Sequence, residues 1–318
     1  MKQVYLIISI DTECDKGPGW KLQRPMAFEN IIMGQPQNLA PLFGQYSIKP
    51  TYLLSPEVMQ HADSVSYFKS LKHVELGTHL HIEFIEPAAD WEADRTKGIQ
   101  ADLDSGVEYD KLKNLTSLFK DQFGYQPSSF RAGRFGIGKD SFQHLHQLGY
   151  AVDSSVTPFK THYYESGTVN NFWGCPVHPY RISNTDLIQV PVSIANEDFS
   201  KLPSWIVKNV KDKRTLSKRV LGRLGYKSKS KWFRPFKSDG KDLMEVSEQL
   251  IKSTPANKTP VLNMMFHSNE IWPAASPYCQ TEEEVRLYCK ALKEVFDFLH
   301  DNYAVCSIGL GEYAKYFK

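Results

Sequence analysis

Residues 75–81 read ELGTHLH and end in two histidines that are separated by a single residue. Residues 73–80 predict a strand, and in an extended segment side chains two residues apart point to the same side, so one ion can contact both imidazoles. Alternatively, His79 and His81 are ordinary polar residues at a strand end, which is the commoner role of histidine. The pair is therefore a candidate metal site that needs further ligands from elsewhere in the chain.

Eight short runs with the pattern of strands recur along the 318 residues, with helical or loop segments between them. Several are nearly continuous apolar runs, as in parallel strands that are covered on both faces. The runs are residues 4–11, 50–54, 73–80, 128–133, 150–155, 187–192, 261–267 and 303–308. Helices are predicted over residues 107–123, 140–148 and 281–300. This alternation predicts an α/β fold in one domain spanning residues 1–318, either a (β/α) barrel or an open doubly wound sheet.

Ionisable residues occur at or just after the C-terminal ends of five of these runs. They are Asp11, His79, Arg131, Asp153 and His267. In α/β barrels, catalytic side chains come from these ends and gather on one rim. We therefore expect the five residues to surround one active site.

Basic residues are concentrated in one stretch. The whole chain carries a formal charge of +2, but residues 208–237 hold twelve basic residues against the single acid Asp212, a local charge of +11 that leaves −9 for the rest. The basic residues are Lys208, Lys211, Lys213, Arg214, Lys218, Arg219, Arg223, Lys227, Lys229, Lys231, Arg234 and Lys237. Apolar residues alternate with them, which predicts a basic helical insertion over residues 200–240.

Two interpretations of this insertion remain open. It is either a solvated surface segment or an amphipathic segment that contacts an anionic membrane or a phosphate-bearing substrate. Nucleic acid is not expected as a partner, because no recognition motif accompanies the charge. The substrate could then be a saccharide on a lipid pyrophosphate carrier or another phosphate-bearing precursor.

The N-terminal residues MKQVYLIISIDTE lack the pattern of a signal peptide and the length of a membrane span. Five scattered cysteines without CxxC spacing are typical of reduced thiols. They are Cys14, Cys175, Cys279, Cys289 and Cys306. We expect a cytoplasmic protein, with peripheral membrane contact as an option.

Five ordered motifs resemble those of the polysaccharide deacetylases, the NodB homology domain of carbohydrate esterase family 4, in a form that contains HxH. They are SIDTE at 9–13, GTHLH at 77–81, FRAGRFG at 130–136, VDSSVTP at 152–158 and MFHS at 265–268. The resemblance implies a distorted (β/α) barrel of seven or eight strands. It also implies one divalent metal ion, held by a carboxylate and two histidines, and removal of an N-acetyl group from a sugar.

The resemblance also implies roles for the residues of the first two motifs. Asp11 corresponds to the catalytic base. Glu13 takes the place of the carboxylate ligand, which the family usually has directly after the base. His79 and His81 correspond to the metal-binding histidines. The common family spacing is HxxxH, which would put Glu83 in the second position, so Glu83 is the rival of His81.

The later motifs complete the expected site. Arg131 corresponds to the arginine that holds the catalytic aspartate, and His267 to the general acid, with Asp153 as the partner that fixes its tautomer. The loop from Arg131 to Phe135 is expected to offer a backbone N–H to the oxyanion. Arg134 and Phe135 are expected to contact the substrate.

Aromatic residues in loops near the strand ends are candidates for stacking on a sugar. They are Trp20, Trp173, Tyr180 and Trp272. We favour Trp272, because it lies five residues after His267 in a proline-containing loop. The fourth motif has Ser155 and Val156 where the family usually has an aromatic residue, so the acetyl pocket is expected to be built differently.

Mixed imidazole and carboxylate ligands favour Zn²⁺, with Co²⁺, Ni²⁺ and Mn²⁺ as alternatives. The leading hypothesis is a metal-dependent deacetylase of an N-acetylated sugar in surface-glycan or lipid-linked saccharide metabolism. One alternative is hydrolysis of another C–N bond, in a formamido sugar or a cyclic ureide. The other is a catalytically decayed carbohydrate-binding protein, which Thr12 and the missing HxxxH histidine would suit.

Overall fold

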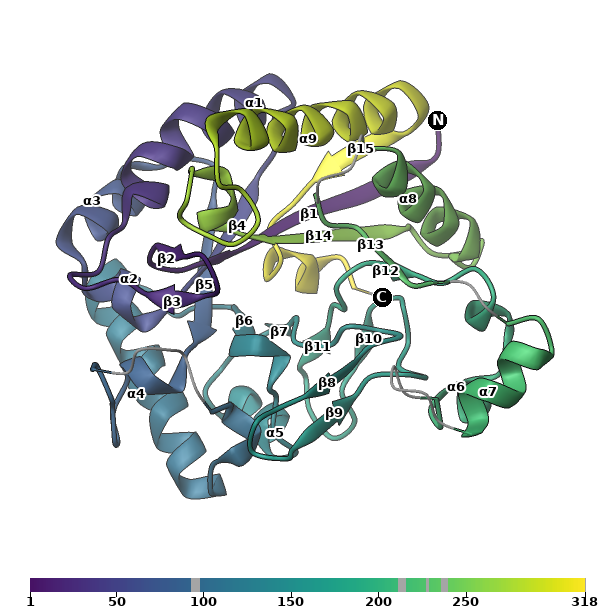
Figure 1. Ribbon diagram of the computed structural model, residues 1–318, viewed down its shortest axis with the longest axis horizontal. Coiled ribbons are helices and arrows are strands. Elements are labelled where there is room, and N and C mark those ends of the chain that lie inside the picture. The colour runs from purple at the N-terminus through teal and green to yellow at the C-terminus, as the bar shows by residue number, and fades with distance from the viewer. Residues whose placement is uncertain (93–97, 211–215, 227–228, 236–239, 318) are drawn as a thin grey trace.

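The computed structural model describes residues 1–92, 98–210, 216–226, 229–235 and 240–317 (Figure 1). Nine strands form its main sheet: β1 (Gln3–Thr12), β4 (Pro50–Leu54), β5 (Glu75–Leu80), β6 (Ser129–Ala132), β7 (Val152–Asp153), β10 (Tyr180–Arg181), β11 (Ile188–Gln189), β14 (Val261–His267) and β15 (Ala304–Ser307). Their order is β10-β11-β7-β6-β5-β4-β1-β14, and β15 also pairs with β1.

All pairings in this sheet are parallel except that of β10 with β11. The eight strands with a parallel partner lie in the eight runs predicted from the sequence, apart from one residue at each end of β1. The strongly curled sheet confirms the distorted (β/α) barrel. β10 was not predicted, because its two residues, Tyr180 and Arg181, are not fully buried and carry no apolar run.

The α-helices are α1 (Ala40–Gln45), α2 (Pro56–Gln60), α3 (Ala62–Ser70), α4 (Ser105–Phe123), α5 (Ser141–Gln147), α6 (Ser204–Val207), α7 (Leu216–Arg223), α8 (Lys241–Ser253) and α9 (Glu282–Asn302). Helices α1, α3, α4 and α9 lie around the outside of the sheet (Figure 1). The three predicted helices correspond to α4, α5 and α9. Thr281 caps α9 as its pattern predicts, by accepting a hydrogen bond from the amide of Glu284.

The two faces of β1 have different roles. Leu6, Ile8 and Ile10 belong to the large apolar cluster under the helices, whereas Ile7 belongs to a smaller cluster inside the barrel with Leu53 of β4. Because side chains alternate along a strand, the residues on the side of Ile7 include Ser9 and Asp11. The barrel interior is thus apolar near the beginning of β1 and polar near its end.

The barrel is not closed by a ladder between β11 and β14. Individual hydrogen bonds bridge this seam in the described chain. The amide of Ser193 donates to the Asn263 carbonyl at 3.0 Å, and the Asn263 side chain donates to the carbonyls of Val190 and Pro191 at 3.3 and 3.2 Å. Shortly after the seam, β12 (Ile194–Ala195) begins the segment that returns in β13 (Lys231–Trp232), antiparallel to β12.

The segment between β12 and β13 contains most of the predicted basic insertion. Its helices α6 and α7 lie at the periphery of the molecule, away from α1 and α3 (Figure 1). Some of the basic residues named above lie outside the described residues: Lys211, Lys213, Arg214, Lys227 and Lys237. No helix in the described ranges is long and apolar enough to cross a bilayer.

The remaining strands are β2 (Lys16–Gly17) paired with β3 (Lys21–Leu22), and β8 (Thr161–Tyr163) paired with β9 (Val169–Asn171). One ten-residue π-helix is also present, η1 (Asn30–Leu39). The short 3₁₀ helices are η2 (Ile82–Phe84), η3 (Gln100–Asp102), η4 (Gly133–Phe135), η5 (Phe199–Lys201), η6 (Ser268–Ile271) and η7 (Glu312–Lys315). The β2–β3 hairpin, η4 and η6 follow the C-terminal ends of β1, β6 and β14, and they form part of the rim described below.

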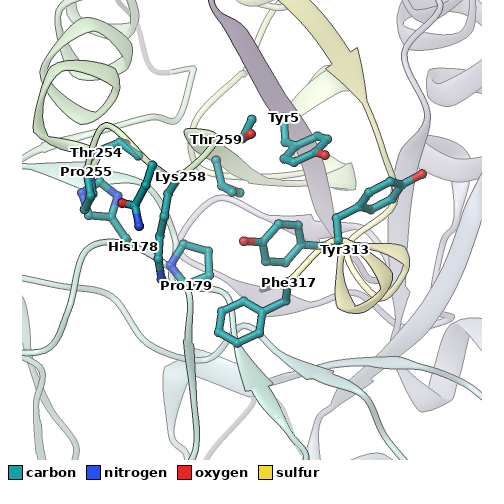
Figure 2. Close-up of a pocket in the computed structure, with 12 residues that line it drawn as sticks. Tyr5, His178, Pro179, Thr254, Pro255, Lys258, Thr259, Tyr313 and Phe317 are labelled. Atoms are coloured by element: carbon teal, nitrogen blue, oxygen red, sulfur yellow. The ribbon is translucent and has the colours of Figure 1, made fainter.

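A cavity of about 370 Å³ lies at the opposite end of the barrel (Figure 2). It is lined by Tyr5 near the beginning of β1, by Val261 at the beginning of β14 and by Tyr313 and Phe317 from the C-terminal segment. In parallel barrels the rim that carries catalytic residues is at the other ends of these strands. This aromatic cavity is therefore separate from the predicted site.

Candidate metal centre

Glu13, His79 and His81 form a buried group whose ligand atoms all lie within 4.8 Å of one another. The strand register brings them together. Thr12, Leu54 and Thr78 are aligned across β1, β4 and β5. Glu13 directly follows Thr12 and His79 directly follows Thr78, so the two residues lie at the same height along the barrel. Glu13 Oε1 lies 3.2 Å from His79 Nε2 and 2.9 Å from His81 Nε2.

The outer nitrogen of each imidazole has a hydrogen-bond acceptor. His79 Nδ1 lies 3.0 Å from the Arg131 carbonyl, and His81 Nδ1 lies 3.3 Å from Glu83 Oε1. Donation from Nδ1–H to these acceptors leaves both Nε2 lone pairs directed at Glu13, which is the usual arrangement of metal-binding histidines. Burial lowers the pKa of His79 to about 3, so its ring is neutral at neutral pH. The three residues fit a divalent metal ion with at least one open coordination position.

Glu83 supports His81 and does not join the ligand group. Its carboxylate accepts from His81 and, at 3.0 Å, from Arg134. Burial alone would raise the pKa of Glu83, but the bond to His81 and the charge of Arg134 lower it to about 2. Of the two rivals for the second histidine position, the structure therefore puts His81 next to Glu13.

Asp11 lies beside this group and is held by Arg131. Arg131 is fully buried and donates to Asp11 Oδ1 at 2.5 Å, to Ser9 Oγ at 2.6 Å and to the carbonyl of Ser154 at 2.9 Å. Burial would raise the pKa of Asp11, but Arg131 and the neighbouring histidines outweigh it and hold the pKa at about 2. Asp11 is thus ionised, and its other carboxylate oxygen, Oδ2, lies 4.0 Å from His79 Nε2.

His267 faces Asp11 from the neighbouring strand. The two residues are aligned in the β1–β14 register, and His267 Nε2 lies 4.0 Å from Asp11 Oδ2. The side chain of His267 is 16% exposed, against 3% for Asp11, so it is the group nearer to solvent.

The expected pairing of His267 with Asp153 is wrong. His267 Nδ1 lies 2.7 Å from Glu270 Oε1 in η6, while Asp153 accepts from the amide and hydroxyl of Ser155 at 2.8 and 2.6 Å. Burial raises the pKa of Asp153 to about 6. Asp153 is a buried residue of β7. It lies next to Ser154, whose hydroxyl accepts a hydrogen bond from the Arg131 guanidinium.

The loop of the third motif lies at the edge of the group. Arg134 and Phe135 both have positive φ, 55° and 57°, and Arg134 holds Glu83 as described. The Phe135 ring lies 5.4 Å from the His162 ring and 6.0 Å from the Trp232 ring, centroid to centroid. Arg134 therefore contacts the candidate metal centre through Glu83, whereas the described ring contacts of Phe135 are with residues of β8 and β13.

The aromatic ring beside the candidate catalytic histidine is Trp20. The β2–β3 hairpin turns Trp20 back so that its ring centroid lies 5.1 Å from that of His267 and 5.5 Å from that of Tyr278. Trp272, which we favoured, is half-buried and has no ring contact with His267 among the described residues. Closeness in sequence to His267 was a poor guide, because the β2–β3 hairpin brings a residue from the other end of the chain.

Lys16 is a further part of the site that the sequence analysis missed. Its side chain is 3% exposed, and its ammonium contacts Glu13 Oε2. Burial lowers the pKa of Lys16 to about 8. The SIDTE motif ends at Glu13, so nothing in the motif indicated that the third residue after it folds back onto the carboxylate.

No protein-family model and no curated protein matches the sequence. Solved structures do resemble the fold. A Mycobacterium smegmatis protein assigned as a polysaccharide deacetylase matches 90% of this chain and 77% of its own, with a TM-score of 0.52 and 13% identity. Puue allantoinase matches 98% of this chain and 89% of its own, with a TM-score of 0.54 and 11% identity.

The 4-alpha-glucanotransferase from Thermococcus litoralis also matches, over 100% of this chain and 41% of its own, with a TM-score of 0.53 and 14% identity. At these identities the similarity shows the fold that the chain shares with deacetylases, an allantoinase and a glucanotransferase. Because one fold carries several chemistries, the activity has to be argued from the site.

Proposed function

We propose that the protein is a metal-dependent hydrolase that removes the N-acetyl group from an N-acetylated sugar. One observation carries the proposal: Asp11 Oδ2 lies 4.0 Å from both His79 and His267, between the Glu13/His79/His81 group and a partly exposed histidine. Hydrolysis of an amide needs a proton acceptor for water and a proton donor for nitrogen at one place, and this arrangement offers both.

Glu13, His79 and His81 would hold the metal ion. When bound, a divalent ion supplies Lewis acidity to the acyl oxygen and to a water molecule. Asp11, held in one orientation by Arg131, accepts a proton from water as the new C–O bond forms. His267 donates a proton to the amide nitrogen as the C–N bond breaks, so the products are acetate and a free amine.

Zn²⁺ is the proposed ion, since two imidazoles and one carboxylate are typical ligands of catalytic zinc. Co²⁺, Ni²⁺ and Mn²⁺ bind the same ligand types. The sugar is proposed to stack on Trp20, which replaces Trp272 as the aromatic candidate because its ring lies next to that of His267. Arg134 and Phe135 remain proposed substrate contacts.

A metal-supplemented screen tests the proposal. The purified protein is stripped with a chelator, reloaded with each of the four ions and incubated with oligomers of N-acetylglucosamine, with N-formyl sugars and with allantoin. We expect acetate release from the N-acetyl sugars that requires the metal. Formate release alone, or opening of allantoin alone, would favour the other C–N hydrolase. A protein that binds none of the ions would favour a decayed, carbohydrate-binding protein.

The predicted basic insertion over residues 200–240 suggests that the protein meets its substrate at a surface. Trp205 of α6 is 65% exposed, Leu224 directly after α7 is 68% exposed, and the basic Lys208, Arg219 and Arg223 are also exposed. Apolar side chains that enter the interface, together with basic residues that meet anionic headgroups, favour a membrane surface. We therefore propose peripheral contact with an anionic membrane and a carrier-linked saccharide as substrate.

Sedimentation with vesicles tests this contact. Binding is expected to phosphatidylglycerol vesicles at low salt, to weaken at high salt and to be absent with phosphatidylcholine. The double substitution Trp205→Ser and Leu224→Ser should reduce binding at both salt concentrations. If inorganic pyrophosphate binds as well and the double substitution has no effect, the segment recognises phosphate groups of the substrate and no membrane.

A further inference from the structure

His267 is held by residues that the five motifs do not include. Glu270 Oε1 accepts from the backbone amide of His267 at 3.0 Å and faces its Nδ1 at 2.7 Å. Glu270 Oε2 accepts from the hydroxyl of Tyr288 in α9 at 2.9 Å. With Nδ1 engaged in this way, Nε2 is the nitrogen directed toward Asp11.

Arg234, near the end of the basic stretch, contacts the same carboxylate. Its guanidinium pairs with Glu270 Oε1 and has its terminal nitrogen 3.1 Å from His267 Nδ1. The Tyr278 ring lies under the guanidinium, with its centroid 4.8 Å from Cζ. Arg234 and Glu270 are 9% and 1% exposed. A buried charge pair of this kind fixes geometry, because either partner alone would be a buried unpaired charge.

The backbone next to Arg234 is hydrogen-bonded to the barrel. The amide of Phe233 donates to the Ser193 carbonyl at 2.8 Å, and the Phe233 side chain is fully buried. Ser193 is the residue that bridges the seam to β14. The end of the basic segment is thus part of the barrel wall beside His267, whereas α6 and α7 are peripheral.

We propose that Glu270 and Arg234 are positioning residues that hold His267 in the orientation needed to protonate the leaving nitrogen. Glu270 fixes the ring through Nδ1 and favours the doubly protonated imidazole, and Arg234 keeps Glu270 ionised and in place. The end of the basic segment is then a required part of the catalytic site. The catalytic part of this inference rests on the proposed deacetylase function, while the positioning part stands on the contacts above.

The charged groups that face His267 are Glu270 of η6, Arg234, Asp11 of β1 and, more distantly, His79 of β5. Burial lowers the pKa of His267, the hydrogen bond that its ring donates to Glu270 opposes this effect, and the charge of Arg234 adds to the lowering. Removing the carboxylate charge should therefore lower the pKa of His267, by about one unit or more for a neighbour at hydrogen-bond distance.

The test compares Glu270→Gln and Arg234→Met with the wild type in two measurements. The first is the nuclear magnetic resonance titration of His267, assigned with a His267→Gln variant, which needs no substrate. The second is hydrolysis of a trimer of N-acetylglucosamine against hydrolysis of 4-nitrophenyl acetate, whose phenolate leaves without a proton. Glu283→Gln and Arg286→Gln, which break an exposed Arg–Glu pair on α9, are the matched controls.

We expect Glu270→Gln to lower the pKa of His267 and to reduce kcat on the amide by about 10²-fold, the usual scale of general acid catalysis, with a much smaller effect on the ester. Arg234→Met should also reduce kcat on the amide more than on the ester, because Glu270 loses the group that holds it in place. This variant is not expected to lower the pKa of His267, because the charge of Arg234 itself lowers that pKa. The controls should match the wild type. Equal losses on amide and ester with an unchanged His267 titration would overturn the proposal. If wild-type protein deacetylates nothing, the proposed function fails, and the titration alone decides the positioning role.

Discussion

Asp11 lies in β1 and Glu13 directly follows the end of β1, with Thr12 between them, whose hydroxyl donates to the Ile10 carbonyl at 3.0 Å. Their partners differ. Asp11 is bound by Arg131, and Glu13 is surrounded by His79, His81 and Lys16. The spacing of one residue is therefore what a strand requires if both acids are to reach the barrel interior.

Exchanging these acids for amides should separate the two roles. Asp11→Asn is expected to keep the metal ion and to reduce kcat by about 10²-fold or more, because the proton acceptor is lost while the ligands remain. His79→Ala should lose both metal and turnover. Metal content by elemental analysis, measured beside acetate release, checks this. Loss of metal in Asp11→Asn together with a harmless Glu13→Gln would reverse the two assignments.

Glu83 contacts the candidate metal centre through His81. Glu83→Gln is expected to weaken Zn²⁺ binding about 10- to 100-fold, the usual effect of losing a carboxylate behind a ligating histidine. Competition with a chromophoric chelator measures the affinity. Glu86→Gln, three residues further along and exposed, is the control. Equal affinities for the two variants would show that Glu83 does not orient His81.

Motifs located most of the candidate site because strand ends converge on one rim, but they did not predict partners that come from outside the motifs. Glu270 had a signal, since a glutamate three residues after a helix cap is the pattern of a capping box, and His267 and Glu270 form one. Lys16 had no such signal, and Trp20 was only one of four aromatic candidates. Their positions depend on how the β2–β3 hairpin folds back, which no local pattern specifies.

At the scale of elements, the ends of β5 and β6 lie close together at the candidate metal centre. A methyl group on Gly133 would collide with the backbone carbonyl of Leu80, and His81 follows Leu80 directly. Gly133→Ala is therefore expected to destabilise the protein by about 1–3 kcal/mol, the usual cost of overpacking. Urea unfolding measures this change. Gly106→Ala in α4, where a methyl group meets nothing within 4 Å, is the control and should not destabilise.

Asp153 in β7 should make stability depend on pH. Its pKa is about 6 in the folded protein against an ordinary value of 3.8, so between these values the folded state binds more protons than the unfolded state. Stability is then lost as pH rises through this window, by about 3 kcal/mol in total. Asp153→Asn should lack this loss in urea unfolding from about pH 4 to about pH 7. The exposed Asp186→Asn should keep the wild-type slope.

The strands were predictable because parallel strands that are covered on both faces need apolar runs, such as those of β1 and β14. The lengths of β7 and β11 were less predictable. Each has two paired residues within a predicted run of six. In the run of β11, the apolar pattern continues through Val190 and Val192 after the ladder has ended. Burial gives rise to the pattern, and pairing decides where the strand ends.

At the scale of the whole molecule, the three candidate metal ligands come from the ends of β1 and β5. A metal ion that binds only the folded state should stabilise the entire chain, by about 2.7 kcal/mol at a free concentration one hundred times the Kd. Thermal unfolding with and without Zn²⁺ measures this. Asp11→Asn should retain the stabilisation and His79→Ala should lose it. An unchanged Tm in wild-type protein at saturating Zn²⁺ would contradict a site of this kind.

The seam between β11 and β14 is also a place where the chain can accept inserted residues. New residues placed within a ladder would break strand pairing, whereas residues added next to the seam cost mainly the entropy of closing a longer loop, which grows by only about 0.6 kcal/mol for each doubling of loop length. The segment that carries α6 and α7 enters and leaves at this place. Additions there can change what the molecule touches while the strands that carry Asp11, His79 and His267 keep their register.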